Sequence, residues 1–175
     1  MKAFVMVALL CVTSTAAAQH AAPPGHEHGA AGPGQGHLVA QSCADEFEKV
    51  VGSGRGFGLA FAADQNGYPG PMHVLELKDR LKLTADQEAK MHTLMAAMFS
   101  ESQPKSARLL DAERKLRRLF ADSAASRAAV RAAAAEVEHA RAEVRLVHLL
   151  THLRTRDLLT DEQRRLYQEA RWPKP

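Results

Sequence analysis

Two long stretches of the chain repeat apolar positions every three or four residues, which is the spacing of one face of an α-helix. The first stretch, which begins after Thr84, has at these positions Met91, Met95, Met98, Ser102, Lys105, Leu109, Ala112, Leu116 and Leu119. The second stretch has Val130, Ala133, Val137, Ala140, Val144, Val147 and Thr151. Each stretch covers about 35 residues, so each helix would be about 50 Å long. Helices of this length pair along their apolar faces, and the pattern predicts an antiparallel hairpin that turns at Asp122 and Ser123.

The first stretch is interrupted around Pro104, where Ser102 and Lys105 take the place of apolar residues. A proline inside a helix removes one backbone hydrogen bond and clashes with the preceding turn. We therefore expect a kink or a local break of the first long helix at this point.

A five-residue pattern occurs both before the first long stretch and after the second. It reads Leu83-Thr84-Ala85-Asp86-Gln87 and then Leu159-Thr160-Asp161-Glu162-Gln163. In such a capping box the threonine hydroxyl accepts a hydrogen bond from the third helical N–H, and the glutamine reaches back to the threonine N–H. The pattern predicts that Thr84, Gln87, Thr160 and Gln163 cap two helices, with Leu83 and Leu159 free to enter a shared core.

Shorter elements precede the hairpin. Ser42 to Val51 forms a short predicted helix, and Pro71 to Leu81 forms a second one, because proline suits the first position of a helix. The glycine-rich run from 52 to 58 lacks the Gly-Lys-Ser/Thr ending of an ATP-binding loop. We expect it to be flexible chain that leads to a turn at residues 66–71.

The second long helix carries another apolar stripe near its end, made of Leu146, Leu149, Leu150 and Leu153. A two-helix hairpin buries only one face of each helix, so this leucine stripe needs a further cover. We expect both the short terminal helices and a second copy of the chain to cover it. The predicted fold is all-α: a long antiparallel hairpin with short N- and C-terminal helices, a four-helix hook over residues 72–171 that forms a homodimer.

The N-terminus has the pattern of a secretory leader. A lysine is followed by an apolar run from Ala3 to Val12 and by small residues, which predicts a signal peptide over residues 1–18 and a soluble exported chain. Residues 19–42 are rich in glycine, proline and histidine, and such a composition is typical of a disordered segment. His26 and His28 could bind a divalent cation weakly there, although a solvated linker is the simpler interpretation.

Charge and motifs exclude several classes of function. The formal net charge is +3, and loss of Lys2 with the leader brings it closer to balance, so nucleic acid is not an expected partner. Neither a metalloprotease His-Glu-x-x-His motif nor a hydrolase Gly-x-Ser-x-Gly motif occurs, and we expect no enzyme activity. Cys43 is the one cysteine left after removal of the leader, and acidic neighbours favour a buried, inert thiol.

His148 and His152 are the strongest candidates for chemistry. Residues four apart share one face of a helix, so the two imidazoles could hold one cation, or they could simply pack in the core. The spacing alone does not decide between these interpretations. His73 borders the apolar face of the predicted short helix, and three protein ligands plus water would make a workable site.

The combination of a signal peptide, a glycine- and proline-rich lead, Asn66-Gly67-Tyr68-Pro69-Gly70-Pro71-Met72-His73 and two Leu-Thr-x-x-Gln boxes resembles the Spy/CpxP-like family. It is most similar to the periplasmic heavy-metal sensor and zinc-resistance branch, over roughly residues 52–170. The resemblance implies a hooked helical hairpin, dimerisation, residence in the periplasm and a role in envelope or metal stress.

The resemblance also implies a ligand set. Metal-sensing members use histidines of the first short helix and a histidine pair late in the third helix, positions that His73, His148 and His152 match. This chain has one histidine in the first helix where the nickel and cobalt sensors have two, and Met95 lies near the position of their carboxylate. His92 or Glu76 would then supply the remaining ligand.

The expected function is that of a periplasmic stress protein or sensor that binds a divalent transition metal and modulates an envelope-stress or metal-resistance response. Zinc is the first expectation, and nickel, cobalt and copper are alternatives. A membrane sensor kinase or an anti-sigma protein would be the partner. The alternative is an ATP-independent holdase for unfolded periplasmic proteins, suggested by the two capping boxes, the leucine stripe and a basic cluster. The methionines at 91, 95 and 98 would add adaptable contacts. The basic cluster consists of Arg114, Lys115, Arg117 and Arg118.

Overall fold

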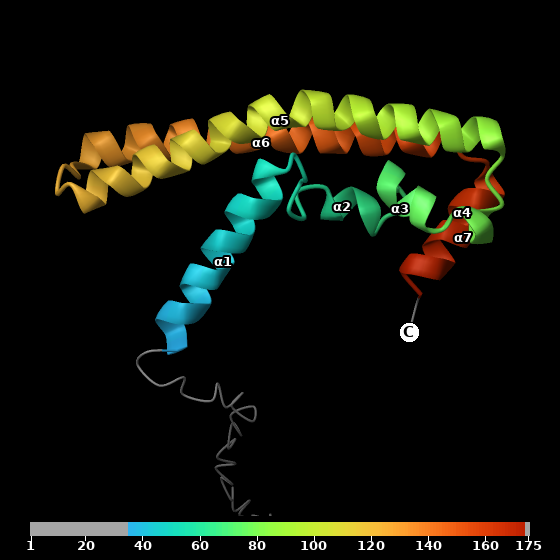
Figure 1. Ribbon diagram of the computed structural model, residues 1–175, viewed down its shortest axis with the longest axis horizontal. Helices are drawn as coiled ribbons and strands as arrows, with labels where there is room; N and C mark the ends of the chain where they lie inside the picture. Colours follow the sequence, from blue (N-terminus) through green and yellow to red (C-terminus); the bar gives the residue numbers. More distant parts are fainter. Residues whose placement is uncertain (1–34, 174–175) are drawn as a thin grey trace, which may run out of the picture.

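The computed structural model describes residues 35–173, which form helices joined by turns. The helices are α1 (Gln35–Gly52), α2 (Phe61–Asp64), α3 (Pro71–Glu76), α4 (Lys78–Leu81), α5 (Ala85–Ala121), α6 (Arg127–Asp157) and α7 (Asp161–Arg171). α5 and α6 form a long antiparallel hairpin, with α2, α3, α4 and α7 beneath the half that contains the start of α5 (Figure 1). The all-α hairpin predicted from the sequence is confirmed.

Both capping boxes are present, at the starts of α5 and α7. Thr84 accepts from the Gln87 N–H and Gln87 from the Thr84 N–H, and the same two bonds join Thr160 and Gln163. The two glutamines also bond to each other: Gln87 Nε2 donates to Gln163 Oε1 at 2.8 Å, and Gln163 Nε2 donates to Gln87 Oε1 at 2.9 Å. This amide pair fastens the two turns at one end of the molecule together.

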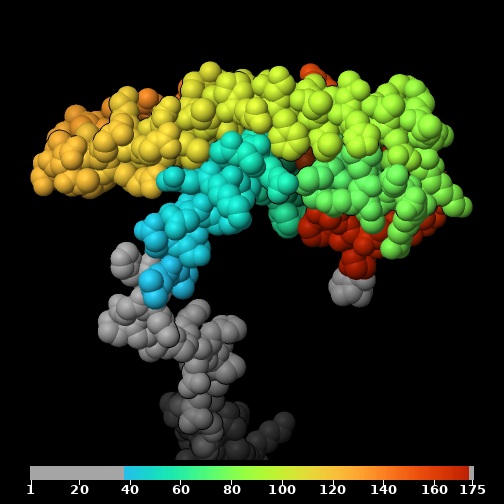
Figure 2. All heavy atoms as spheres, viewed as in Figure 1, coloured from blue at the N-terminus to red at the C-terminus, as the bar shows by residue number. Residues whose placement is uncertain are grey.

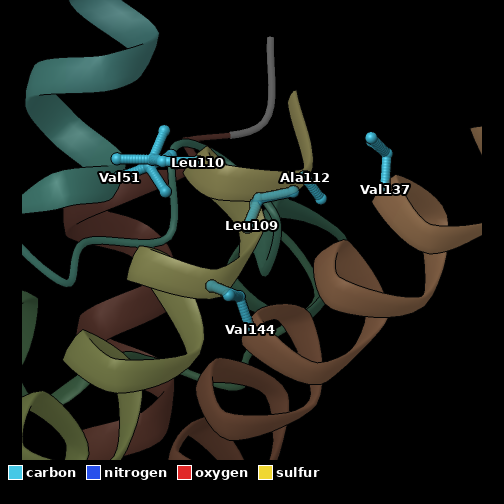
Figure 3. Close-up of a cluster of buried hydrophobic side chains, with 6 residues drawn as sticks. All are labelled: Val51, Leu109, Leu110, Ala112, Val137 and Val144. Atoms are coloured by element: carbon cyan, nitrogen blue, oxygen red, sulfur yellow. The ribbon is translucent and has the colours of Figure 1, made fainter. Parts of the chain in front are cut away.

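Two apolar clusters hold the helices in place. The first cluster lies where α1 meets the middle of the hairpin (Figure 3) and contains Val51, Leu109, Leu110, Ala112, Val137 and Val144. The second lies under the amide pair and contains Val74, Leu81, Met91, Leu159 and Tyr167, with Leu83 packed against it. Leu83 and Leu159 therefore meet as predicted. Full burial of a valine, leucine or methionine side chain stabilises the fold by about 1.5–3 kcal/mol. The first cluster therefore holds α1 against the hairpin, and the second holds α3, α4 and α7.

A kink or a local break was predicted at Pro104, and of these the break does not occur, because α5 continues through this residue to Ala121. Contacts with α6 hold the helix on both sides of the proline. Ser102 Oγ lies 3.3 Å from His148 Nε2, and Lys105 Nζ lies 3.0 Å from a carboxylate oxygen of Glu143. Tertiary contacts thus outweigh the loss of one backbone hydrogen bond.

Two further boundaries differ from the prediction. The helix expected from Pro71 to Leu81 is divided at Leu77, which lets Leu75 and Leu77 both pack against the second cluster although residues two apart point in opposite directions on one helix. α1 begins at Gln35 rather than at Ser42, so residues 35–42 of the expected disordered lead are helical. The chain has neither glycine nor proline between His37 and Val51, which permits this longer helix.

The leucine stripe is largely uncovered within one chain. Leu146, Leu150 and Leu153 are 51%, 41% and 46% exposed. The terminal helices were expected to cover these leucines, and they do not. Cys43 is also exposed, on α1, which contradicts the buried thiol predicted above. Within residues 35–173, no helix has the length and apolar character needed to cross a membrane.

The two ends of the hairpin differ in how much covers them. The end that carries the amide pair has α2, α3, α4 and α7 beneath it, whereas none of the helices in residues 35–173 lies beneath the turn between α5 and α6, at the left of Figure 1. Figure 2 shows a hollow under the middle of the hairpin, between α1 and the helices that lie under the other half. The predicted leader over residues 1–18 and the histidines His26 and His28 lie outside the described residues.

Candidate metal site

A pocket of about 390 Å³ lies beneath the hairpin, and the histidines at 73, 148 and 152 all line it. α6 contributes two of the imidazoles, α3 contributes the third, and the loop before α2 forms one wall. The apolar part of the lining comprises Val50, Phe57, Ala60, Phe61, Pro71, Met72, Met98, Phe99 and Trp172. The three histidines predicted from the sequence therefore share one pocket.

The glycines of the preceding loop are what allow the imidazoles of α6 to lie against the backbone. A Cβ at Gly56 would be 3.0 Å from His148 Cγ, and a Cβ at Gly70 would be 3.0 Å from His152 Nε2. At either position a side chain would fit only if the facing imidazole moved. Gly56 belongs to the glycine-rich run and Gly70 to the turn before α3, and both line the pocket.

His148 and His152 are buried, with exposed fractions of 5% and 7%. His152 Nδ1–H donates to the Tyr68 carbonyl at 2.6 Å, which leaves the lone pair on Nε2. His148 hydrogen-bonds to the backbone of Gly54, and the hydroxyl of Ser102 faces its Nε2. An imidazole held by one nitrogen, with the other free to accept, is the arrangement of a metal-binding histidine.

Burial lowers the pKa of both imidazoles. For His148 the proximity of His152 lowers the pKa further, and the hydrogen bond to Gly54 opposes the shift. For His152 the hydrogen bond to Tyr68 and the carboxylate of Asp64 oppose the effect of burial. A lowered pKa makes the neutral imidazole the dominant form at neutral pH, and this is the form that binds metal ions.

His73 lies at the rim of the pocket and is held from both sides. Its Nδ1–H donates to Glu76 at 3.1 Å, and its Nε2 accepts from Nη2 of Arg171 at 3.2 Å. A guanidinium has donors only and keeps its proton, so the lone pair of His73 must be on Nε2. His73 and His152 thus both have their lone pair on Nε2, the ring nitrogen farther from the backbone.

A buried polar group beside the pocket was not predicted. Asp64, 6% exposed, accepts a hydrogen bond from the Tyr167 hydroxyl and another from Nε of Arg171 at 3.0 Å. Burial and the bond to Asp64 raise the pKa of Tyr167. One sequence signal was available: Asp64 is the only charged residue between Gly56 and Met72, in a segment otherwise composed of apolar residues, glycine and amides.

The two remaining candidate ligands, Glu76 and His92, differ in their relation to the site. Glu76 is exposed but bonded to His73, whereas His92 is exposed on α5 and is not among the residues that line the pocket. Within residues 35–173, no group of three or more histidine, cysteine, aspartate or glutamate side chains lies close enough to hold one metal ion. The donors therefore suit a transition metal in their chemistry, but in this arrangement the lone pair of His73 accepts a hydrogen bond from Arg171.

The basic cluster on α5 is mostly paired with acidic residues. Arg114 contacts Asp111, Lys115 contacts Glu136 at 2.9 Å and Arg117 contacts Glu48. Met91 is fully buried and Met98 is 8% exposed, so these two methionines pack inside the hairpin. The simpler interpretation of both features, a solvated face and a packed seam, agrees with these contacts.

Comparison with known proteins gives one match. Residues 55–165 match a family model described as heavy-metal resistance. The matched region contains the glycine wall, all three pocket histidines and both capping boxes. Searches of curated proteins and of solved structures found no match.

Proposed function

The chain belongs to the heavy-metal resistance family, and from that premise we propose that it is an exported stress protein that binds a divalent transition metal ion in the pocket beneath its hairpin. His148 and His152 provide the first two ligands and His73 the third. The observation that carries the proposal is the shared pocket, which all three imidazoles line and in which His73 and His152 each have the lone pair on Nε2.

The ion would bring a positive charge that draws the three imidazoles together. Tyr68 and Glu76 hold two of the rings in position, and apolar side chains surround them in the pocket. Zinc binds neutral imidazoles and accepts nitrogen and oxygen ligands in the same site. We therefore propose zinc first, with nickel, cobalt and copper as alternatives.

Calorimetric titration of the mature chain with zinc, nickel and copper tests the proposal. We expect a dissociation constant in the micromolar range or lower. In the double variant His148→Ala/His152→Ala the affinity should fall by about tenfold or more. The control is His92→Ala with His139→Ala, which removes two exposed imidazoles of the same hairpin and should leave the affinity unchanged. Binding that disappears only in His26→Ala with His28→Ala would move the site to the N-terminal segment and refute the pocket.

We propose further that the leucine stripe is the contact surface for a second copy of the chain in the periplasm. Its three exposed leucines support an apolar contact, and a homodimer is what the resemblance implies. The same stripe is the one feature that favours the alternative function, an ATP-independent holdase. Light scattering of a denatured client protein in the presence of chelator separates the two functions, since no suppression at equimolar protein would exclude the holdase.

A further inference from the structure

The guanidinium of Arg171 occupies a position surrounded by the ligands of a cation. His73 Nε2 lies 3.2 Å from Nη2, a carboxylate oxygen of Asp64 lies 3.0 Å from Nε, and a carboxylate oxygen of Glu76 lies 4.0 Å from Nη1. One imidazole nitrogen and two carboxylates make up a donor set that a transition metal ion also uses. In this structure the guanidinium of Arg171 occupies the position between these three groups.

Arg171 and a metal ion cannot use His73 together. The Nε2 atom has one lone pair, and Nδ1 is committed to Glu76, so a bond to a metal requires that the N–H of Arg171 withdraw. Two positive charges close to one imidazole would also repel each other, and the partial exposure of His73 and Arg171 lets water weaken this repulsion only in part.

Resting on the metal-binding function proposed above, we infer that Arg171 is an internal competitor of the metal: the ion completes its ligand set only when Arg171 leaves His73, and this frees the last turn of α7 from α2 and α3. The release would be local. Tyr167 and Gln163, earlier in α7, are buried, with Tyr167 in the second cluster and Gln163 in the amide pair, so the start of α7 stays in place.

The chain carries a reporter at the point where movement is expected. Trp172 is the single tryptophan, it follows Arg171 directly, and it packs edge-on against Phe61 of α2 with 5.3 Å between ring centroids. The Arg171 guanidinium also lies 6.0 Å from the Trp172 ring. Withdrawal of Arg171 should therefore change the environment and the fluorescence of this one residue.

Zinc titration of the mature chain, followed by calorimetry and by tryptophan emission on the same sample, tests the inference. We expect the emission of Trp172 to change with the same midpoint as the heat. Arg171→Gln should bind zinc about tenfold or more tightly, the range of a typical coupling between sites, and Arg171→Lys, which keeps the charge, should stay closer to the original affinity. Arg165→Gln is the matched control, because Arg165 lies on the same helix but pairs with Glu162 and Glu169 away from the pocket.

The outcomes separate this inference from the function on which it rests. Zinc that binds with Trp172 emission unchanged, or that binds Arg171→Gln no more tightly than the original chain, overturns the competition and leaves the metal function standing. Absence of zinc binding in both proteins overturns both. If zinc binds to Arg171→Gln but not to the original chain, the result supports the competition and indicates that Arg171 stays bonded to His73 in the original chain. Because the emission measurement on the original chain needs no substitution, poor folding of a variant would still leave a decisive result.

Discussion

Asp64 is a carboxylate that the protein buries and then compensates with two donors. A buried charge without partners is strongly destabilising, so the hydroxyl of Tyr167 and the guanidinium of Arg171 are needed as much for folding as for the site. The same bond affects the tyrosine, because it is lost if Tyr167 ionises. The pKa of Tyr167 is raised accordingly, by burial first and by Asp64 second.

This shift has a consequence for alkaline stability. The folded protein holds the Tyr167 proton more tightly than the unfolded chain, whose tyrosine pKa is about 10. The stabilisation is therefore fully present below pH about 10 and decreases as the pH rises above that value. We predict that the free energy of unfolding, measured by urea denaturation at several pH values, falls less steeply above pH about 10 in Tyr167→Phe than in the original chain.

Tyr68→Phe is the control for the alkaline experiment, since Tyr68 holds His152 through its backbone carbonyl and not through its hydroxyl. It should retain the full alkaline slope. At neutral pH, Tyr167→Phe should be less stable by about 1.5–3 kcal/mol, the usual contribution of a hydrogen bond to a charged group. Equal slopes in Tyr167→Phe and the original chain would show that the tyrosine is not the group responsible.

Between elements, the amide pair of Gln87 and Gln163 joins the starts of two helices that are far apart in the chain. Each amide also completes its own capping box, and Gln87 Nε2 donates in addition to the Leu158 carbonyl at 2.9 Å. One side chain thus caps a helix and fixes the position of another. Loss of either glutamine leaves the remaining amide without its partner.

A double-mutant cycle measures this coupling. We predict that Gln87→Ala and Gln163→Ala each lower the free energy of unfolding by about 1–3 kcal/mol, and that the double variant loses less than the sum, because the second removal no longer leaves an unpaired amide. Urea denaturation followed by circular dichroism is the measurement. Gln87→Ala combined with Ser126→Ala, which removes the N-cap of α6 at the other end of the hairpin, should be additive within about 0.5 kcal/mol.

The elements that the sequence predicted are those specified by local patterns. The three-and-four spacing predicts α5 and α6, and each capping box lies within five residues, so the starts of α5 and α7 follow from short-range chemistry alone. The pairing of the two boxes does not, since it joins residues 87 and 163. The local break considered at Pro104 and the continuous helix predicted through Leu77 are wrong for a related reason: contacts with α6 keep one helix continuous, and packing against the second cluster divides the other.

The candidate site was predictable to the same extent. The spacing of His148 and His152 places them on one face of a helix, and the resemblance added His73. The closing wall at Gly56 and Gly70 could not be inferred, because a glycine run indicates freedom of the backbone and says nothing of what packs against it. Arg171 was also missed, since only the folded chain brings it beside His73.

For the molecule as a whole, the leucine stripe is the surface whose role is most open to test. A glutamate at Leu150, which is 41% exposed, should leave the fold of one chain intact because it adds a charge to a surface already in contact with water. In a dimer that buries the stripe, the same charge would be buried without a partner. We predict that Leu150→Glu is as helical as the original chain but monomeric by sedimentation.

Ala142→Glu is the matched control for this variant, as it adds the same charge at an exposed position of α6 away from the stripe. It should remain dimeric. If Leu150→Glu also remained dimeric, the stripe would not be the contact between the two copies, and a dimer would have to form through another surface.

The unequal covering of the hairpin ends has a further consequence, for hydrogen exchange. Amide protons in the part of α5 that packs on α3 and the second cluster can exchange only when several helices separate, whereas those beside the turn at residues 122–126 need only the two hairpin helices to fray. A short pulse of deuterium should therefore label peptides around that turn well before those around Met91. The hairpin would then open first beside the turn at residues 122–126, and the part of α5 around Met91 would open last.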